Sequence, residues 1–235
     1  MKAKSNEINM VILIYARLNS KRLPNKVLLK INSKPLIQII IERIKNITKF
    51  NLPIIVVTSN QKSDDPLAKF CLNHNIEFFR GDLNNVFKRT IQAFNRYKFK
   101  SFIRVCADRP FFDTVLMDRM IQKFIKKKYQ IVTNQFPRTY PHGLACEIAD
   151  ISIFKKLNLK YMTASDKEHM FNFFYRNSKS YKIFNFLNKN DHSGINASLD
   201  DKKDLLKIRK IYKRYKKKQY IDFYKIKNNE LTKYS

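Results

Sequence analysis

The stretch INMVILIYARLNSKRLPNK, residues 8–26, decides the fold and raises the functional question. Residues 8–16 are almost entirely apolar, which predicts a strand buried on both faces. The loop that follows is strongly basic, and basic residues at the end of a buried strand suit a bound anion. Phosphate is a good candidate, because arginine offers a planar fork to its oxygens and lysine a compact charge. The basic residues of this loop are Arg17, Lys21, Arg22 and Lys26.

Apolar runs alternate with helical patterns through the first half of the chain. Strands are predicted at 8–16, 52–59, 76–80 and 101–107, and helices at 34–47, 63–75, 84–99 and 113–128. Ser33 is the expected N-cap of the first helix, with Pro35 in its first turn. The alternation predicts an α/β fold with a mostly parallel sheet flanked by helices. Ligands bind such sheets beyond the carboxyl ends of the strands, where the basic loop also lies.

The second half of the chain is less regular. A strand is predicted at 130–135, a loop at 136–148 that leads into a strand, a helix at 165–177, and strands at 181–187 and 195–199. The segment 201–235 is expected to be a basic helical tail. The apolar side of its helix would carry Leu205, Leu206, Ile208, Ile211 and Tyr215. No repeat and no low-complexity linker is visible, so we expect a single domain over residues 1–235.

The net charge of +29 over 235 residues has two explanations. One is a nucleic-acid or membrane-surface partner. The other is compositional drift, because Lys, Asn, Ile, Phe and Tyr are abundant and only three glycines occur. The charge is spread along the chain rather than concentrated, which favours drift. No RNA- or DNA-binding motif is present, so we expect no specific nucleic-acid partner.

Cysteine usage and hydropathy indicate the compartment. The three cysteines are far apart and form no C-x-x-C pair, which argues against disulfides and structural zinc. The first apolar run is shorter than a signal-peptide core, and no segment reaches the roughly 20 apolar residues of a membrane span. We therefore expect a cytoplasmic protein with no transmembrane segment.

Two aspartates follow apolar runs at the active edge of the predicted sheet. Asp108 follows the strand 101–107, and Asp200 follows the run 195–199. A pair of carboxylates at strand ends would suit Mg²⁺, which takes oxygen ligands and shares them with phosphates. Either residue could instead cap a helix, a role that aspartate fills well. Histidines at zinc-binding spacing and a G-x-S-x-G nucleophile elbow are both absent from the sequence.

Seven segments, in order, resemble the motifs of nucleotide-sugar cytidylyltransferases, the family that makes CMP-Kdo and CMP-neuraminate. The resemblance is greatest to the spore-coat-polysaccharide (SpsF-like) branch and spans roughly residues 8 to 212. The segments are YARLNSKRLPNKVL, VVTSNQKSDDPLA, FFRGDLNNVFKR, IRVCADRPFFD, RTYPHGLACEI, KEHM and LDDKKDLLKIRKIY.

The resemblance implies a Rossmann-like nucleotidyltransferase fold and transfer of CMP from CTP to a sugar acid, with release of pyrophosphate, for surface glycan synthesis. It also implies Mg²⁺ as cofactor, held by Asp108 and Asp200, and a homodimer. By position, nucleotide binding would fall to Ala16, Arg17, Ser20, Arg22, Lys26, Arg80 and Arg104, and catalysis to Arg17, Arg22, Lys26 and Asp108. The sugar would face Arg138, Tyr140, Glu147 and His169.

The chain departs from the family pattern at several positions. Asn19 and Asn25 stand where the first loop usually has glycine, and asparagine tolerates positive φ better than most residues. Arg109 replaces a small residue beside the proposed metal ligand and adds a cation there. Two alternatives stay open at this point. One is a basic nucleic-acid-binding protein on an α/β fold, and the other is a relative that binds sugar nucleotides without catalysis.

Overall fold

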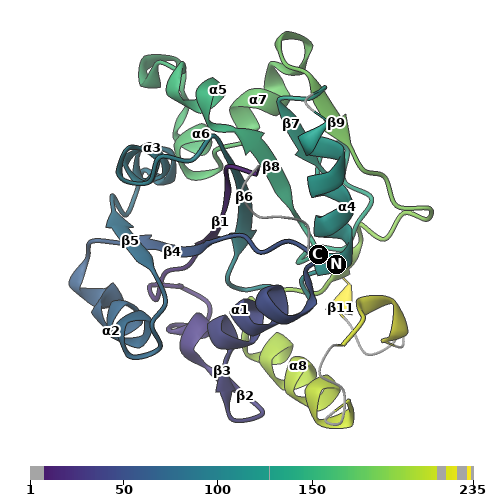
Figure 1. Ribbon diagram of the computed structural model, residues 1–235. Helices are drawn as coiled ribbons and strands as arrows, with labels where there is room; N and C mark the ends of the chain where they lie inside the picture. The colour runs from purple at the N-terminus through teal and green to yellow at the C-terminus, as the bar shows by residue number, and fades with distance from the viewer. Residues whose placement is uncertain (1–7, 127, 216–220, 227–231, 234–235) are drawn as a thin grey trace.

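A computed structural model describes residues 8–126, 128–215, 221–226 and 232–233. Within this part of the chain a seven-stranded sheet has the order β5-β4-β1-β6-β8-β7-β9 (Figure 1). Its strands are β1 (Met10–Tyr15), β4 (Ile54–Ser59), β5 (Phe78–Gly81), β6 (Ser101–Cys106), β7 (Ile131–Thr133), β8 (Glu147–Asp150) and β9 (Ile183–Asn185). Only β8 runs antiparallel to its neighbours, so the predicted mostly parallel sheet is confirmed.

Helices cover both faces of the sheet. The α-helices are α1 (Leu36–Ile47), α2 (Asp65–Asn73), α3 (Val86–Arg96), α4 (Thr114–Ile125), α5 (Ile151–Lys155), α6 (Ala164–Glu168), α7 (Asn172–Arg176) and α8 (Lys202–Arg214). Figure 1 shows α3, α5, α6 and α7 on one side of the sheet and α1, α2 and α8 on the other. None of the helices in the described part of the chain combines the length and apolarity that a membrane crossing needs.

The strand β1 belongs to two hydrophobic cores at once. Met10, Ile12 and Ile14 pack into the core beneath α1, α4 and α8. The alternate residues Val11, Leu13 and Tyr15 pack into the core beneath α3, α5 and α7. Successive side chains of a strand point to opposite faces. The unbroken apolar run therefore follows from burial on both sides.

A hairpin precedes α1 and displaces the predicted N-cap. The strands β2 (Lys30–Ile31) and β3 (Lys34–Pro35) pair through a two-residue loop. The loop residues Asn32 and Ser33 have φ of 47° and 72°, as a type I′ turn requires. Ser33 is therefore a hairpin residue, and the prediction that it caps α1 is wrong. Pro35 occupies the N-cap position instead.

The predicted helix 165–177 is wrong, because the chain forms two short helices there. The first, α6, ends at Glu168, and the second, α7, begins at Asn172. His169 between them leaves helical geometry, with φ −109° and ψ 76°. Met170 and Phe171, which lie in the break, are both buried in the core beneath α3, α5 and α7.

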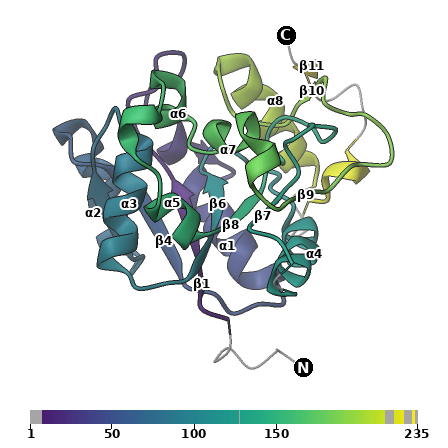
Figure 2. The ribbon, with the colours of Figure 1, turned by 90° about the horizontal axis from the view of Figure 1, so that it is seen from above.

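The segment after residue 194 is less regular than predicted. Of the predicted strand 195–199, only Ile195–Asn196 forms a strand, β10, which pairs with β11 (Thr232–Lys233) outside the main sheet. The predicted basic helix forms as α8 from Lys202 to Arg214, but a single 3₁₀ turn at Phe223–Lys225 and the strand β11 follow among the described residues, so the tail is not helical throughout 201–235. Residues 216–220 of the predicted helix lie outside the described residues. Leu206 is 67% exposed rather than on the apolar side. Figure 2 shows α8 near β10 and β11.

Gly143 permits a close approach that positions the last part of the chain. Its neighbour His142 donates its backbone N–H to Ile195 O at 2.8 Å and accepts from Ala197 N at 2.7 Å. A Cβ on Gly143 would lie 2.6 Å from Ala197 C and 2.6 Å from Ser198 N, and its φ is +101°. Only glycine fits such a position without displacement of the backbone. The segment that carries Asp200 is thereby held against the sheet edge.

We expect Gly143→Ala to lower the free energy of unfolding by about 2 kcal/mol or more, through backbone strain and the clash with residues 197–198. Urea titration followed by circular dichroism measures the effect. Gly194→Ala is the matched control, because a Cβ there meets no atom within 4 Å. Equal stability of the two variants would contradict the packing described above.

Candidate active site

The first loop, residues 16–25, folds through its own backbone and leads into a 3₁₀ turn, η1 (Lys26–Leu28). Asn25 adopts the left-handed conformation with φ 58°, as its replacement of a family glycine suggested. Asn19 is not among the described residues with positive φ. Asn25 N donates to Leu18 O at 2.9 Å, which closes the loop and aims Lys26 back toward the sheet. Ser20 Oγ accepts from Leu23 N at 3.4 Å inside the same loop.

A buried carboxylate, Asp64, anchors this loop to the end of β4. Asp64 is fully buried, and its Oδ1 accepts from Leu18 N at 2.7 Å. Its Oδ2 accepts from Ser59 N at 3.2 Å and from the Ser59 hydroxyl. The sequence interpretation missed this role. An acidic residue before a helical pattern normally indicates a cap, but Asp64 makes no capping hydrogen bond to α2.

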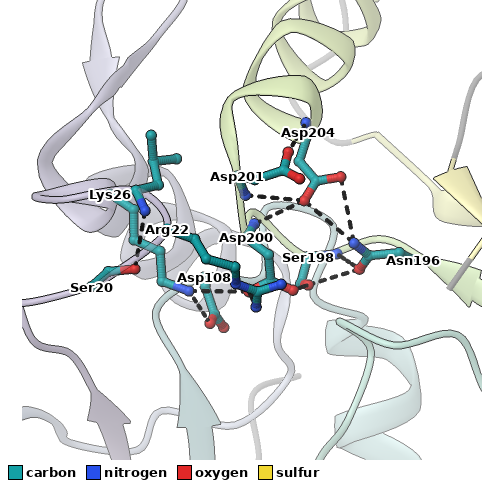
Figure 3. Close-up of polar contacts among 10 residues, drawn as sticks. Ser20, Arg22, Lys26, Asp108, Asn196, Ser198, Asp200, Asp201 and Asp204 are labelled. Atoms are coloured by element: carbon teal, nitrogen blue, oxygen red, sulfur yellow. Dashed lines mark hydrogen bonds and ion pairs between the residues drawn. The ribbon is translucent and has the colours of Figure 1, made fainter. Parts of the chain in front are cut away.

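Lys26, Asp108 and Asp200 meet at the carboxyl end of the sheet (Figure 3). Lys26 Nζ donates to Asp108 Oδ2 at 2.7 Å and to Asp200 Oδ1 at 3.3 Å. The two aspartates are termed the carboxylate pair below. Arg22 approaches from the solvent side, with Nη2 3.3 Å from Asp200 Oδ1 and its side chain 70% exposed. The structure thus brings together four residues that the sequence singled out from distant segments.

Asp200 is held in place by the segment around it. Its Oδ2 lies 2.7 Å from the Ser198 hydroxyl, and its backbone N donates to Asp204 Oδ2 at 3.0 Å. Asp204 N in turn donates to Asp201 Oδ1 at 2.9 Å, and the two residues form a capping box at the start of α8. Asp201, rather than Asp200, is therefore the helix cap. The carboxylate of Asp200 remains directed at Lys26.

The charges of the cluster stabilise one another. Burial by itself would raise the pKa of Asp108, but the nearby Lys26 ammonium and Arg109 guanidinium lower it below its usual value. Burial by itself would lower the pKa of Lys26, but Asp108 and Asp200 raise it above its usual value. Asp108 and Lys26 are therefore both charged at neutral pH.

A pocket of about 220 Å³ is lined by Arg104, Arg109, Gln135, Ala145, Glu147, His169, Phe171, Asn172 and Tyr175, and Arg109 directly follows Asp108 in the chain. Arg104 on β6 stands opposite Glu147 on β8, and the two side chains form a buried ion pair. Tyr175 OH donates to the other oxygen of Glu147 at 2.6 Å. Burial and then Glu147 raise the pKa of Tyr175 well above its ordinary value, so its hydroxyl stays protonated. Both oxygens of Glu147 are thus already hydrogen-bonded.

Arg109 forms part of the pocket wall. Its side chain is largely buried and donates through Nη1 to the carbonyl oxygen of Ala145. Arg109, which replaces a small residue of the family pattern, is therefore held by a backbone carbonyl and does not extend into solvent. Its guanidinium adds positive charge to the pocket and helps to lower the pKa of Asp108.

Other predicted site residues lie further from the cluster. Arg80 holds the loop after β4, donating to Ser59 O at 2.9 Å and to Gln61 O at 2.8 Å. Arg138 Nη2 donates to Ser193 O at 3.3 Å. Tyr140 is buried in the core and its hydroxyl donates to the Leu187 carbonyl at 3.5 Å, whereas the pocket that contains His169 is lined by other residues.

Two more predicted site residues, Ala16 and Arg17, lie at the start of the first loop. Arg17 Nη2 lies 3.4 Å from Glu168 Oε1 at the end of α6, and both side chains are about half exposed. Ala16 is buried directly after β1, and its backbone N donates to Val57 O at 3.1 Å. The loop therefore continues the sheet hydrogen bonding for one residue before it turns.

The carboxylate pair fits a divalent cation that also binds other ligands. One ammonium reaches both carboxylates, so their oxygens converge on a single position. Among the described residues there is no cluster of three or more His, Cys, Asp or Glu side chains that could hold a metal alone. A Mg²⁺ ion at this place would therefore need oxygen ligands from a bound molecule and water, which is its usual mode with phosphates.

The fold and this site together define a nucleotidyltransferase-like protein. In this α/β fold a basic loop follows the first strand of the sheet. Its Lys26 contacts a pair of carboxylates, Asp108 and Asp200, that come from segments far apart in the sequence. The solved structure of a cytidylyltransferase from Leptospira borgpetersenii serovar Hardjo-bovis matches with a TM-score of 0.83 at 26% identity, covering 89% of this chain and 88% of that one. The Rossmann-like fold is thereby confirmed.

The chain belongs to the cytidylyltransferase family, whose sequence profile matches residues 11–233. The spore coat polysaccharide biosynthesis protein SpsF of Bacillus subtilis (strain 168) is 25% identical over 215 residues, covering 88% of this chain and 87% of SpsF. The 3-deoxy-manno-octulosonate cytidylyltransferase of Francisella tularensis subsp. novicida is 31% identical over 128 residues, covering 53% of this chain and 50% of that enzyme. The family predicted from the motifs is confirmed.

We expect Asp64→Asn to lower the free energy of unfolding by about 1–3 kcal/mol, because one of two buried acceptor oxygens becomes an N–H₂ donor that faces other donors. Asp65→Asn is the control at the neighbouring position. Its carboxylate is 58% exposed and pairs with Arg80, so its loss should cost less than about 1 kcal/mol. Chemical denaturation of the two variants measures the difference, and a larger loss at Asp65 would refute the anchoring role of Asp64.

Proposed function

We propose that this protein transfers CMP from CTP to a hydroxyl group of a sugar acid and releases pyrophosphate, in the synthesis of a surface glycan. The observation that carries the proposal is the meeting of Lys26 with the carboxylate pair at the end of the basic first loop. Membership of the cytidylyltransferase family supports CTP as the nucleotide. The pocket that contains Arg109 offers room for the acceptor.

The charge of the pocket supports an acidic acceptor. Glu147 already accepts hydrogen bonds from Arg104 and Tyr175, so its charge is largely compensated. The Arg109 guanidinium and the His169 side chain line the same pocket. Guanidinium groups bind carboxylates well in such partly buried sites. A sugar that carries a carboxylate, as Kdo-like and nonulosonate sugars do, therefore suits this pocket better than a neutral sugar.

The first loop would serve the triphosphate. In the reaction the acceptor hydroxyl oxygen attacks the α-phosphorus of CTP in line and gives up its proton to water, while the bond to the bridging oxygen breaks and pyrophosphate departs. Negative charge develops on the phosphoryl and leaving oxygens, and positioned cations stabilise it. Arg17, Arg22 and Lys26 are the cations of the loop that would do this, with backbone N–H groups as further donors.

Mg²⁺ is the cofactor that we propose for this reaction, held by the carboxylate pair. When bound, such an ion neutralises charge on the phosphoryl oxygens. Asp108 lies two residues after the end of β6, and its backbone O accepts from Leu199 N at 2.8 Å, which ties the two ligand segments together. The chain itself would thus fix the relative position of the two ligands.

We expect pyrophosphate release in the presence of CTP, Mg²⁺ and a sugar acid, and we expect Asp108→Asn to lower its rate by at least about 100-fold. A coupled pyrophosphate assay over a panel of Kdo-like and nonulosonate sugars measures both effects. Glu42→Gln is the control, because this carboxylate lies on α1 and pairs only with Lys34 and Gln38 in the described contacts. Its activity should stay close to wild type.

Two results would count against the proposal. Binding of CTP, seen as a rise in the unfolding midpoint, without release for any sugar acid would indicate a binder that has lost catalysis. Full activity of Asp108→Asn would remove the assigned role of the carboxylate pair.

A further inference from the structure

Lys26 occupies the centre of the carboxylate pair and is shielded from solvent. Its side chain is 15% exposed, and those of Asp108 and Asp200 are 26% and 12% exposed. Its Nζ lies 2.7 Å from one carboxylate and 3.3 Å from the other. The ammonium therefore stands at the point on which both carboxylates converge.

We propose that the Lys26 ammonium is the resident cation of this site in the nucleotide-free protein, and that it excludes the divalent ion until CTP enters. This inference rests on the proposed function, because it concerns the same carboxylate pair. It assigns Lys26 a second role, which is to make metal binding depend on the nucleotide. The phosphates of CTP would then accept the ammonium when the ion takes its place.

The charges of the cluster support this exchange. Two carboxylates face one ammonium inside the cluster, and Arg22 adds a further positive charge at Asp200 from outside. A divalent ion that entered alone would meet the ammonium at close range in a partly desolvated place, where repulsion is strong. The negative charge of a triphosphate would offset the repulsion between the Lys26 ammonium and the divalent ion. The ion and the nucleotide are therefore expected to bind with mutual enhancement.

Compared with the two carboxylates, Lys26 has the side chain that can move more readily by rotation. Asp200 is held by the Ser198 hydroxyl at 2.7 Å and through its backbone by Asp204 at 3.0 Å. The Asp108 backbone accepts from Leu199 N at 2.8 Å, which joins the two carboxylate segments. The long lysine side chain, by contrast, has several rotatable bonds. Exchange of the cation therefore requires movement of Lys26 rather than of the carboxylates.

The test is the affinity of the nucleotide-free protein for Mn²⁺, used as a probe for Mg²⁺ and followed by electron paramagnetic resonance. We expect Lys26→Met to bind Mn²⁺ at least about tenfold more tightly than wild type, because the competing ammonium is gone. Thermal unfolding of the same samples should show a larger rise of the midpoint with Mn²⁺ in Lys26→Met than in wild type. Lys26→Gln provides a second neutral variant if the methionine chain does not fold.

Two controls separate exchange at the site from a general loss of positive charge. Lys21→Met removes an exposed lysine of the same loop and should leave the Mn²⁺ affinity within about threefold of wild type, since surface charges are screened. Adding Asp200→Asn to Lys26→Met should abolish the gain, because one of the two ligands is lost. Equal Mn²⁺ affinity of wild type and Lys26→Met, or an equal gain in Lys21→Met, would overturn the inference.

Failure of this inference is distinguishable from failure of the proposed function. Pyrophosphate release by the wild-type chain tests the function, and Mn²⁺ binding without CTP tests the role of Lys26. An active wild type with no gain in Lys26→Met would refute the exchange alone. A wild type that neither binds CTP nor releases pyrophosphate would refute the function, and the role of Lys26 in coupling would fall with it.

Discussion

The burial of β1 on both faces is the constraint on which the rest of the structure depends. The strand pairs in parallel with β4 on one side and β6 on the other, and its side chains alternate between two cores. A strand in that position has no solvent face, so helices must cover both sides of the sheet. The chain that leaves it can emerge only at the carboxyl edge. The basic first loop is placed there as a direct consequence.

The site then depends on contacts between segments that are far apart in sequence. The first loop is tied to β4 by the buried Asp64 carboxylate. The segment before α8 is tied to the sheet edge by the close approach at Gly143. These two attachments bring Lys26 and Asp200 to the aspartate that follows β6. Structural residues with no chemical role thus determine which charges meet.

The hydrophobic pattern of a segment predicted its secondary structure correctly wherever burial of that segment alone determined the structure. The alternation of apolar runs and amphipathic segments predicted β1, β4 and β6 and the helices between them, because two-sided burial leaves a clear signature. The same reasoning failed at 165–177, where the chain leaves helical geometry at His169 between two short helices, because helical spacing of apolar residues does not reveal such a break. It failed at Ser33 as well, because a serine in a hairpin and a serine at a cap look alike in sequence. Asp64 was missed for a similar reason, since its partners are backbone groups of two other segments.

By itself the sequence determined the fold class and the family, and it supplied the residues for which we propose a chemical role. Those properties follow from composition, periodicity and motif spacing, which can be read from the linear sequence without knowing which residues are in contact. The tertiary structure alone decided that Lys26 lies between Asp108 and Asp200, that both oxygens of Glu147 are engaged, and that Tyr140 is a core residue. The physical reason is that charge interactions and hydrogen bonds act over a few ångströms in space. Residues separated by many positions in the chain come within that range only after the sheet and its two cores have formed.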